Sequence, residues 1–437
     1  MKLKSTNRNN KIFSFKHGLF SPLAPDGGLF MPLEIPRLSS SFFKSIAKKS
    51  LKDIARETSE LWFPKIPKQD INRIIEKSLT FDAPLVFLNE TLAVLELFHG
   101  QTLSFKDFGA RFMAELMCYF LENDDRCLTI LAATSGDTGA AVAHSFFQSE
   151  RVHIIILYPK DGVSAIQEKQ ITGLGKNITA LEINGTFDDC QTLVKQAFAD
   201  RELARTLRLA SANSINIARL ISQTFYYFYA YAQAQARSFA VCPPLVFSVP
   251  CGNFGNLTAG LIAKKMGLPV RQFIAATNSN DVVPRYLCGE PFIPKPSIRT
   301  ISNAMDIGNP SNFARMRTLY HDERAEMQKD IFGASFTDAE TRGAISELYN
   351  RCGYSADPHG AVAYLGLKKY CAQNKKKNTL GIFLETAHPV KFNAIVEPLI
   401  GKKIPLPADL KKLLHKQKQV LPLSNKFEEF KEFLMGF

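Results

Sequence analysis

The sequence predicts an α/β fold with parallel sheets. From about residue 92, short apolar runs alternate with segments of helical pattern, which is typical of strands joined by crossover helices. The chain has 437 residues, 46% of them hydrophobic, so it can form two or three domains with a sizeable core. The expected strands are 92–98, 127–134, 152–159, 178–185, 245–250, 273–277 and 380–386.

The remaining segments follow from composition and periodicity. Residues 1–90 are mixed, with a turn-rich stretch "PLAPDGGLFMP" at 22–32 followed by polar helical text. Between the strands, helices are expected at 139–149, 186–204 and 215–236. The segment after Pro405 is basic and amphipathic and is expected to be helical.

The formal net charge of +13 is compatible with nucleic acid, a membrane surface or small anionic ligands. The densest basic runs, 374–378 and 401–419, lack interleaved aromatic residues, so a solvated basic face explains them better than a nucleic-acid site. No apolar run is long enough to span a membrane. The eight cysteines are scattered without metal-ligand spacing, and no secretory signal follows the N-terminus, so we expect a cytoplasmic protein without a metal.

A lone lysine, Lys106, follows the apolar run 92–98. Ser104 and Asp107 are spaced like a capping box, which predicts that Lys106 is the second residue of a helix. Burial and the positive end of the helix dipole both disfavour an ammonium ion and would lower the pKa of Lys106. Such a lysine suits Schiff-base chemistry, although a surface lysine on an amphipathic helix would fit the same pattern.

Two Gly-rich loops each follow a predicted strand and open a helix. They are "ATSGDTGAA" at 133–141 and "PCGNFGNLTAG" at 250–260. Backbone N–H groups at such helix starts can bind an anion, but similar loops also merely close a strand–helix junction. Neither loop has Walker A spacing, and the second lacks the third glycine of the dinucleotide fingerprint.

The ordered segments "HGQTLSFKDFGA", "ATSGDTGAA", "PCGNFGN" and "ETAHPVKF" resemble the threonine synthases, which are pyridoxal-phosphate (PLP) enzymes of fold type II. Further segments from 22 to 392 are similar to the same family. This resemblance implies parallel α/β domains with PLP in the cleft between them. It also implies a family N-terminal extension at 1–90, a large PLP-binding domain at 91–125 and 215–437, and a smaller inserted domain at 126–214.

The resemblance implies a carbon–oxygen lyase that converts O-phospho-L-homoserine and water to L-threonine and phosphate, the last step of threonine biosynthesis. Lys106 would hold PLP and move protons, Asp137 would lie beside the cofactor O3′ with its protonation open, and Thr386 would face the pyridine nitrogen. The cofactor phosphate would be bound by the backbone amides of Gly252, Asn253, Phe254, Gly255 and Asn256.

Ser135 and Thr138 would bind the substrate carboxylate. The leaving phosphate needs a cation, and Arg219 with Asn216 is the first candidate pair, ahead of Lys160 and Ser164. For Arg219, an ion pair on a helix surface fits the sequence equally well.

Three alternatives remain open at this stage: a threonine or serine dehydratase of the same fold, a binding module that keeps the fold without catalysis, and a basic nucleic-acid binder. The segments "PLAPDGGLFMP" and "AMDIGNPSNFAR" favour a threonine synthase over a dehydratase. We expect small-molecule substrates, no nucleic-acid or membrane partner, and a monomer or homodimer.

Overall fold

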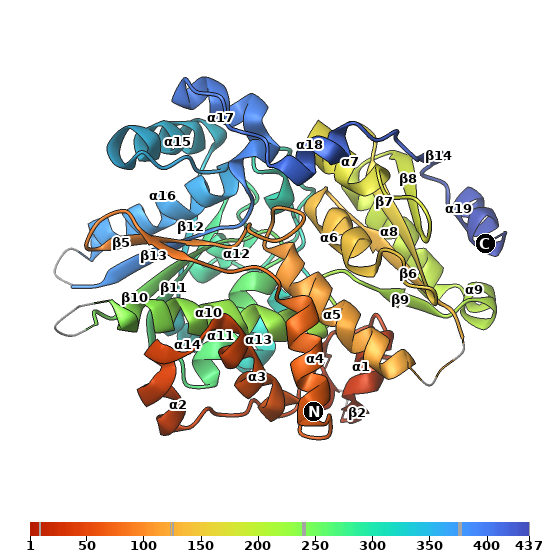
Figure 1. Ribbon diagram of the computed structural model, residues 1–437, viewed down its shortest axis with the longest axis horizontal. Helices are drawn as coiled ribbons and strands as arrows, with labels where there is room; N and C mark the ends of the chain where they lie inside the picture. The colour runs from red at the N-terminus through yellow and green to blue at the C-terminus, as the bar shows by residue number, and fades with distance from the viewer. Residues whose placement is uncertain (8–9, 123, 125, 238–241, 375–377, 437) are drawn as a thin grey trace.

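The computed structural model describes residues 1–437 except 8–9, 123, 125, 238–241, 375–377 and 437. Most of the basic run 374–378 therefore lies outside the described residues. Two parallel sheets form the frame of the molecule, and an N-terminal region packs beneath them (Figure 1). No helix in the described ranges is long and apolar enough to cross a membrane.

The large sheet has six strands in the order β12-β11-β10-β13-β5-β4, all parallel except the edge pair β4–β5. Its strands are β4 (Leu85–Phe87), β5 (Leu92–Glu96), β10 (Leu245–Pro250), β11 (Val270–Thr277), β12 (Ile331–Ser335) and β13 (Leu380–Glu385). β10 and β13 are buried along their whole length, because helices cover both faces of the sheet.

Helices from the second half of the chain, together with α5, cover the large sheet. α16 packs on one face, and α10 and α11 pack on the other (Figure 1). The helices of this part are α5 (Lys106–Leu121), α10 (Ala218–Ala236), α11 (Gly255–Lys265), α12 (Val282–Leu287), η2 (Asn303–Met305), α13 (Phe313–Leu319), α14 (Arg324–Asp330), α15 (Asp338–Cys352), α16 (Pro358–Gln373), η3 (Pro389–Phe392) and α17 (Asn393–Ile400).

The small sheet has five parallel strands in the order β14-β8-β7-β6-β9. They are β6 (Leu128–Ala133), β7 (Val152–Pro159), β8 (Ile178–Asn184), β9 (Leu209–Ser211) and β14 (Leu421–Ser424). The associated helices are α6 (Asp137–Phe146), α7 (Ala165–Thr172), α8 (Phe187–Ala199), α9 (Arg201–Thr206), α18 (Ala408–Leu414) and α19 (Phe427–Met435).

The N-terminal region packs against α5 and α10 at the base of the molecule (Figure 1). It contains an antiparallel sheet in the order β2-β1-β3. Its elements are β1 (Lys2–Ser5), β2 (Phe13–Ser14), α1 (Phe15–Phe20), β3 (Phe30–Pro32), α2 (Ser40–Ser45), η1 (Ile46–Lys48), α3 (Leu51–Trp62) and α4 (Lys68–Ser78).

The structure contains a strand at each of the seven expected positions and a helix at each of the three expected helical segments. It differs from the expected domain division at two edges. β4, inside the expected extension 1–90, pairs with β5 of the large sheet, and β14 pairs with β8 of the small sheet. The segment after Pro405 is therefore not only helical, because it adds a strand between α18 and α19.

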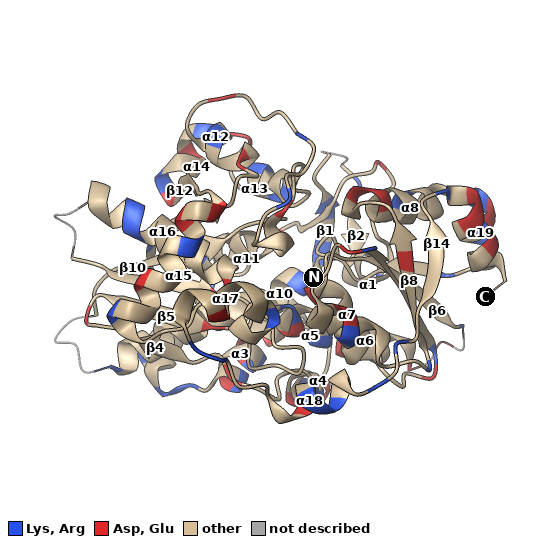
Figure 2. Cartoon of the chain, turned by 90° about the horizontal axis from the view of Figure 1, so that it is seen from above, with Lys and Arg blue, Asp and Glu red and all other residues tan. Residues whose placement is uncertain are grey.

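Charged side chains are interspersed over the surface. Figure 2 shows positions of basic and acidic residues on helices of both sheets, with several acidic positions on α19. In α19 these are Glu428, Glu429 and Glu432.

Candidate active site

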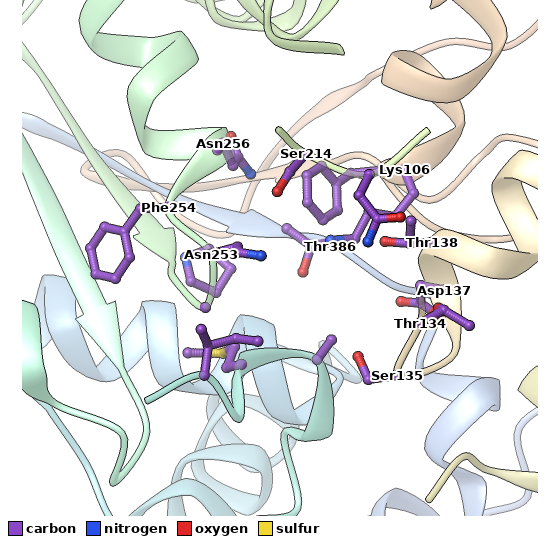
Figure 3. Close-up of a pocket in the computed structure, with 18 of the residues that line it drawn as sticks. Lys106, Thr134, Ser135, Asp137, Thr138, Ser214, Asn253, Phe254, Asn256 and Thr386 are labelled. Carbon is purple, nitrogen blue, oxygen red and sulfur yellow. The ribbon is translucent and has the colours of Figure 1, made fainter. Parts of the chain in front are cut away.

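A cavity lies where the carboxyl ends of strands from both sheets meet. Pro250 ends β10, Thr386 follows β13, and Thr134 follows β6, and all three residues line the cavity. Ligands of open parallel sheets bind at this edge, because helix starts and strand ends converge there. Figure 3 shows Lys106, Asp137 and Thr138 on one side of this cavity and Asn253 and Phe254 on the other.

Lys106 is the first residue of α5, and the predicted capping box is wrong. The helix has no side-chain capping bond at its start. The Asp107 carboxylate instead accepts hydrogen bonds from the N–H and the hydroxyl of Thr102, both at 2.8 Å, because the chain turns back on itself before the helix. The N–H of Phe105 donates to the Thr386 carbonyl at 2.9 Å, which ties the start of α5 to the end of β13.

The pKa of the Lys106 amine is lowered, as the sequence predicts. Burial above all, and then the positive charges of Arg219 and Lys391, lower the pKa of Lys106 from 10.5 to about 8, although the Asp137 carboxylate acts in the opposite direction. The amine lies 4.5 Å from the centre of the Phe105 ring. About half of this lysine is therefore a free amine near pH 8.

The loop between β6 and α6 is closed by the hydroxyl of Thr134. This oxygen accepts hydrogen bonds from the N–H groups of Gly136 and Gly139, both at 2.9 Å. Gly136 has a φ of +127°, a backbone conformation that favours glycine. Because Thr134 closes the turn, the hydroxyls of Ser135 and Thr138 are left to line the cavity.

Asp137 lies at the first turn of α6 and is an ionised carboxylate. Its Oδ1 lies 2.5 Å from the Lys391 ammonium and accepts a hydrogen bond from Gln167 at 2.9 Å. Burial raises the pKa of Asp137, but the charge and hydrogen bond of Lys391 and the bond from Gln167 outweigh it, so the pKa lies below its ordinary value. Charge-assisted bonds of this kind stabilise the carboxylate form.

The second loop wraps the start of α11. Phe254 precedes the helix with left-handed φ and ψ of 60° and 9°, an uncommon conformation for a bulky residue that is often found at functional sites. The Asn253 side-chain oxygen accepts from the N–H and hydroxyl of Ser311 at 2.8 and 2.9 Å. The loop is therefore anchored from outside, while the first N–H groups of α11 remain available to an anion.

Asn256 and Gly252 support this loop in different ways. The Asn256 Oδ1 accepts from two buried tyrosine hydroxyls, Tyr226 at 2.6 Å and Tyr227 at 2.7 Å, while its buried Nδ2 has no partner among the described residues. A Cβ atom at Gly252 would lie 2.7 Å from the Ala304 carbonyl oxygen, so only glycine fits between the loop and η2.

Arg219 lines the cavity and is buried, with 2% of its surface exposed. Its Nη1 donates to the Ala212 carbonyl at 2.8 Å, and its Nε has no partner among the described residues. Burial lowers its pKa to about 10. The alternative of an ion pair on a helix surface is therefore wrong, because this guanidinium is buried.

Three other predicted residues lie elsewhere. Asn216 is buried outside the cavity lining, and its amide donates to the carbonyls of Leu19 and Ser211 at 2.8 and 3.1 Å. Lys160 is exposed at the end of β7, and Ser164 caps α7 by accepting from the Gln167 N–H at 3.3 Å. Neither Lys160 nor Ser164 is among the residues that line the cavity.

Lys391 and His359 are among the residues of this region that the sequence motifs do not single out. Lys391 belongs to the segment "ETAHPVKF", but its pairing with Asp137 could not be read from spacing, because the two residues are far apart along the chain. His359 lines the cavity, and its Nδ1 lies 2.5 Å from Asp357, which caps α16. The Asp-Pro-His run marks a helix start in the sequence, yet nothing in it places the imidazole at the cavity.

The residues of this cavity fit PLP. A free amine at Lys106 can bond the cofactor aldehyde, the start of α11 can accept its phosphate, and the buried Thr386 hydroxyl is available to its ring. The unpartnered Asn256 Nδ2 and the crowding at Gly252 indicate a loop shaped for a ligand, since buried polar groups are otherwise paired.

Comparisons with known proteins agree with this chemistry. Three family models match the chain. The model described as "Pyridoxal-phosphate dependent enzyme" matches residues 81–385, "Threonine synthase N terminus" matches 2–79, and "Threonine synthase, C-terminal" matches 360–434. The chain is 42% identical to the threonine synthase of Buchnera aphidicola subsp. Acyrthosiphon pisum, with 100% of both chains covered. It is 43% identical to that of Escherichia coli K12, with 94% of each covered.

Solved structures give the same result. The crystal structure of threonine synthase from Escherichia coli superposes with a TM-score of 0.92 at 40% identity and covers 100% of both chains. The PLP-bound threonine synthase from Brucella melitensis gives a TM-score of 0.89 at 34% identity, covering 100% of this chain and 99% of that one. The chain belongs to the threonine synthase family of PLP-dependent enzymes.

Proposed function

We propose that this cavity converts O-phospho-L-homoserine and water to L-threonine and phosphate, the carbon–oxygen lyase reaction that ends threonine biosynthesis. The observation that carries the proposal is the meeting of a free amine, Lys106, with two helix starts and a buried guanidinium in one cavity. Full-length similarity to threonine synthases from several bacteria supports the choice of reaction.

PLP, when bound, accepts electron density from the substrate carbon atoms and so makes their protons acidic. Lys106 would hold it, the amides of Gly252, Asn253, Phe254, Gly255 and Asn256 would bind its phosphate, and Thr386 would face its ring nitrogen. Asp137 would lie beside its O3′ oxygen as a carboxylate paired with Lys391.

The chain's own residues supply binding and proton transfer. Ser135 and Thr138 bind the substrate carboxylate with hydroxyls left free by the Thr134 turn. Lys106, whose pKa near 8 allows both protonation states, removes the α-proton and then moves protons at the β-carbon. Arg219 meets the phosphate that leaves from the γ-carbon, because a buried guanidinium binds a dianion strongly.

Arg219 gives the sharpest test of the substrate assignment, because only the phosphate distinguishes O-phosphohomoserine from simpler amino acids. Losing a charge-assisted bond costs about 1.5–3 kcal/mol, so Arg219→Ala should lower kcat/KM by at least about tenfold. The variant should retain bound PLP and its response to amino acids without a phosphate. Lys160→Ala is the matched control, and its kcat/KM should stay near wild type because Lys160 lies outside the cavity.

Two results would contradict the assignment of the phosphate to Arg219. One is an equal loss for substrates with and without a phosphate, which would make Arg219 structural. The other is a larger loss in Lys160→Ala or Ser164→Ala, which would move the phosphate site to α7 and the end of β7. Asn216 is proposed to act only through the position of α10, since its amide is already bonded to Leu19 and Ser211.

The cytoplasm is the proposed compartment, and a monomer or homodimer without nucleic-acid or membrane partners is the proposed state. All eight cysteines are free thiols, which is common in reducing compartments. The interspersed charges of Figure 2 support a small anionic ligand over a nucleic acid. Light scattering of the purified protein would measure the oligomeric state directly.

A further inference from the structure

Lys391 is a buried cation beside the cavity residue Asp137, and the proposed reaction does not use it. Its side chain has 0% exposure, and its Nζ lies 2.5 Å from Asp137 Oδ1 and donates to the Thr102 carbonyl at 2.9 Å. A lysine is almost never fully buried unless it is paired. It lies in η3, shortly after Thr386, which follows the end of β13.

Asp137 is ion-paired with Lys391, and it lines the same cavity as Lys106, on the same side in Figure 3. Lys106 makes no hydrogen bond or ion pair to any described residue, but the negative charge of Asp137 raises its pKa. The charged groups that face Lys106 are Asp137 on α6, Arg219 on α10 and Lys391 on η3. The Asp107 carboxylate is hydrogen-bonded to Thr102 instead, and the His359 imidazole on α16 is hydrogen-bonded to Asp357.

The consequence follows from the pairing of charges. A buried carboxylate requires a nearby cation, and if Lys391 were neutral, the lysine whose pKa the Asp137 charge raises would be Lys106, which lines the same cavity. Lys106 would then be held as an ammonium ion and would lose its nucleophilic form. With Lys391 in place, the carboxylate is already paired, and a second positive charge nearby disfavours protonation of Lys106.

We infer that Lys391 is a positioning residue: by occupying the Asp137 carboxylate, it keeps the Lys106 amine free to bond the cofactor. This inference rests on the proposed role of Lys106 as the cofactor lysine. It adds a function to a lysine that touches neither the substrate nor the reacting atoms.

The test measures the protonation of Lys106 without relying on turnover. The full-length protein, stripped of PLP with hydroxylamine, is acetylated with acetic anhydride across a pH series, and the modified Lys106 peptide is quantified by mass spectrometry. Wild-type labelling should have its midpoint near pH 8. Lys391→Met should move the midpoint upward, toward the ordinary value of 10.5, by about 1 unit or more.

Three further variants separate charge pairing from a general structural effect. Lys391→Arg should keep the wild-type midpoint, because the positive charge remains. Asp137→Asn should move the midpoint downward, since Lys106 then faces cations only. The double variant Asp137→Asn/Lys391→Met should return close to wild type, and because it removes both charges it also covers the case in which Lys391→Met alone does not fold.

Charge pairing predicts that the acetylation midpoint rises in Lys391→Met and falls in Asp137→Asn. An unchanged midpoint in folded Lys391→Met, or a double variant that keeps the single variant's upward shift, would overturn it. Failure of the proposed function would look different: PLP added to the wild-type protein would then not protect Lys106 from acetylation at all.

Discussion

At the scale of single residues, the two glycines of the 252–256 loop differ in what they permit. A Cβ at Gly252 would lie 2.7 Å from the Ala304 carbonyl and 2.8 Å from the Met305 Cα, both backbone atoms that cannot easily move. A Cβ at Gly255 would meet its nearest atom, in Asn312, at 3.4 Å, which is ordinary contact. The loop is thus fixed by packing against η2 at one glycine and is open at the other.

Gly252→Ala should therefore weaken PLP binding, because the added methyl group pushes the loop away from η2. We expect the dissociation constant, measured by absorbance titration, to rise by about tenfold or more, equivalent to about 1.4 kcal/mol. Gly255→Ala is the control and should change it far less. Equal losses in the two variants, or a larger loss in Gly255→Ala, would mean that η2 does not position this loop.

The gathering of motif residues at one cavity could be predicted from the sequence, while the roles assigned to them stay predictions. Lys106, Ser135, Thr138, Arg219, Thr386 and the 252–256 loop all line one cavity. Only folding brings Asp137 to Lys391, and only folding brings His359, which is bonded to its sequence neighbour Asp357, to the cavity. Asn216 and Ser164 have their polar atoms engaged in local bonds that spacing alone does not reveal.

At the scale of an element, α6 depends on one hydroxyl group. Thr134 is buried, and its oxygen accepts from two N–H groups that α6 and its preceding turn would otherwise leave unsatisfied. α6 carries Asp137 and Thr138 into the cavity, so its start must be fixed for either residue to act.

Thr134→Val keeps the shape of the side chain but leaves the N–H groups of Gly136 and Gly139 without an acceptor, at a cost of about 1–3 kcal/mol each. We expect it to lower the free energy of unfolding, measured in urea, by about 2 kcal/mol or more. Thr134→Ser retains the hydroxyl and loses one buried methyl group, which costs about 1 kcal/mol. A serine variant as unstable as the valine variant would show that packing, not capping, sets the start of α6.

The start of α5 shows why a capping motif can mislead. Ser104 and Asp107 have the spacing of a capping box, but Asp107 is bonded to Thr102, and the Ser104 hydroxyl has no partner among the described residues. A tight turn that bonds its own carboxylate competes with the cap for the same atoms. The prediction of the helix and of its buried lysine was sound, while the prediction of its first residue was wrong by one position.

At the scale of the whole molecule, the C-terminal segment crosses to the small sheet. β14 pairs in parallel with β8, and α19 packs its Phe430 and Leu434, both with 0% exposure, into the core beneath that sheet. Lys431 also pairs with Asp200 at 2.9 Å. β14 and α19 therefore close one face of the small sheet, whose α6 carries Asp137.

Phe430→Ala should loosen this edge, because truncating a buried phenylalanine costs about 3–5 kcal/mol. Hydrogen exchange should accelerate in β8 and β14 while β10 in the large sheet stays protected. Met435→Ala, at a side chain that is 40% exposed, is the control and should leave exchange unchanged. Equal acceleration in both sheets would indicate that the molecule unfolds as one unit.

The fold class was confirmed, since long buried strands carry a clear apolar signal. Short strands were not foreseen. β9, β12 and β14 have three to five residues and gain their stability from neighbours rather than from their own pattern. The crossing of the tail to β8 is a long-range contact, and nothing within residues 408–437 encodes its partner.

The identity of the cofactor lysine is the claim on which the site depends. Borohydride reduction of the PLP-loaded protein, followed by peptide mapping, should place the pyridoxyl group on Lys106. The site offers a demanding comparison, because Lys391 is a second buried lysine near the same carboxylate but is already paired. Labelling of Lys106 alone would support the account, and a pyridoxyl group on Lys391 or on any other lysine would contradict it.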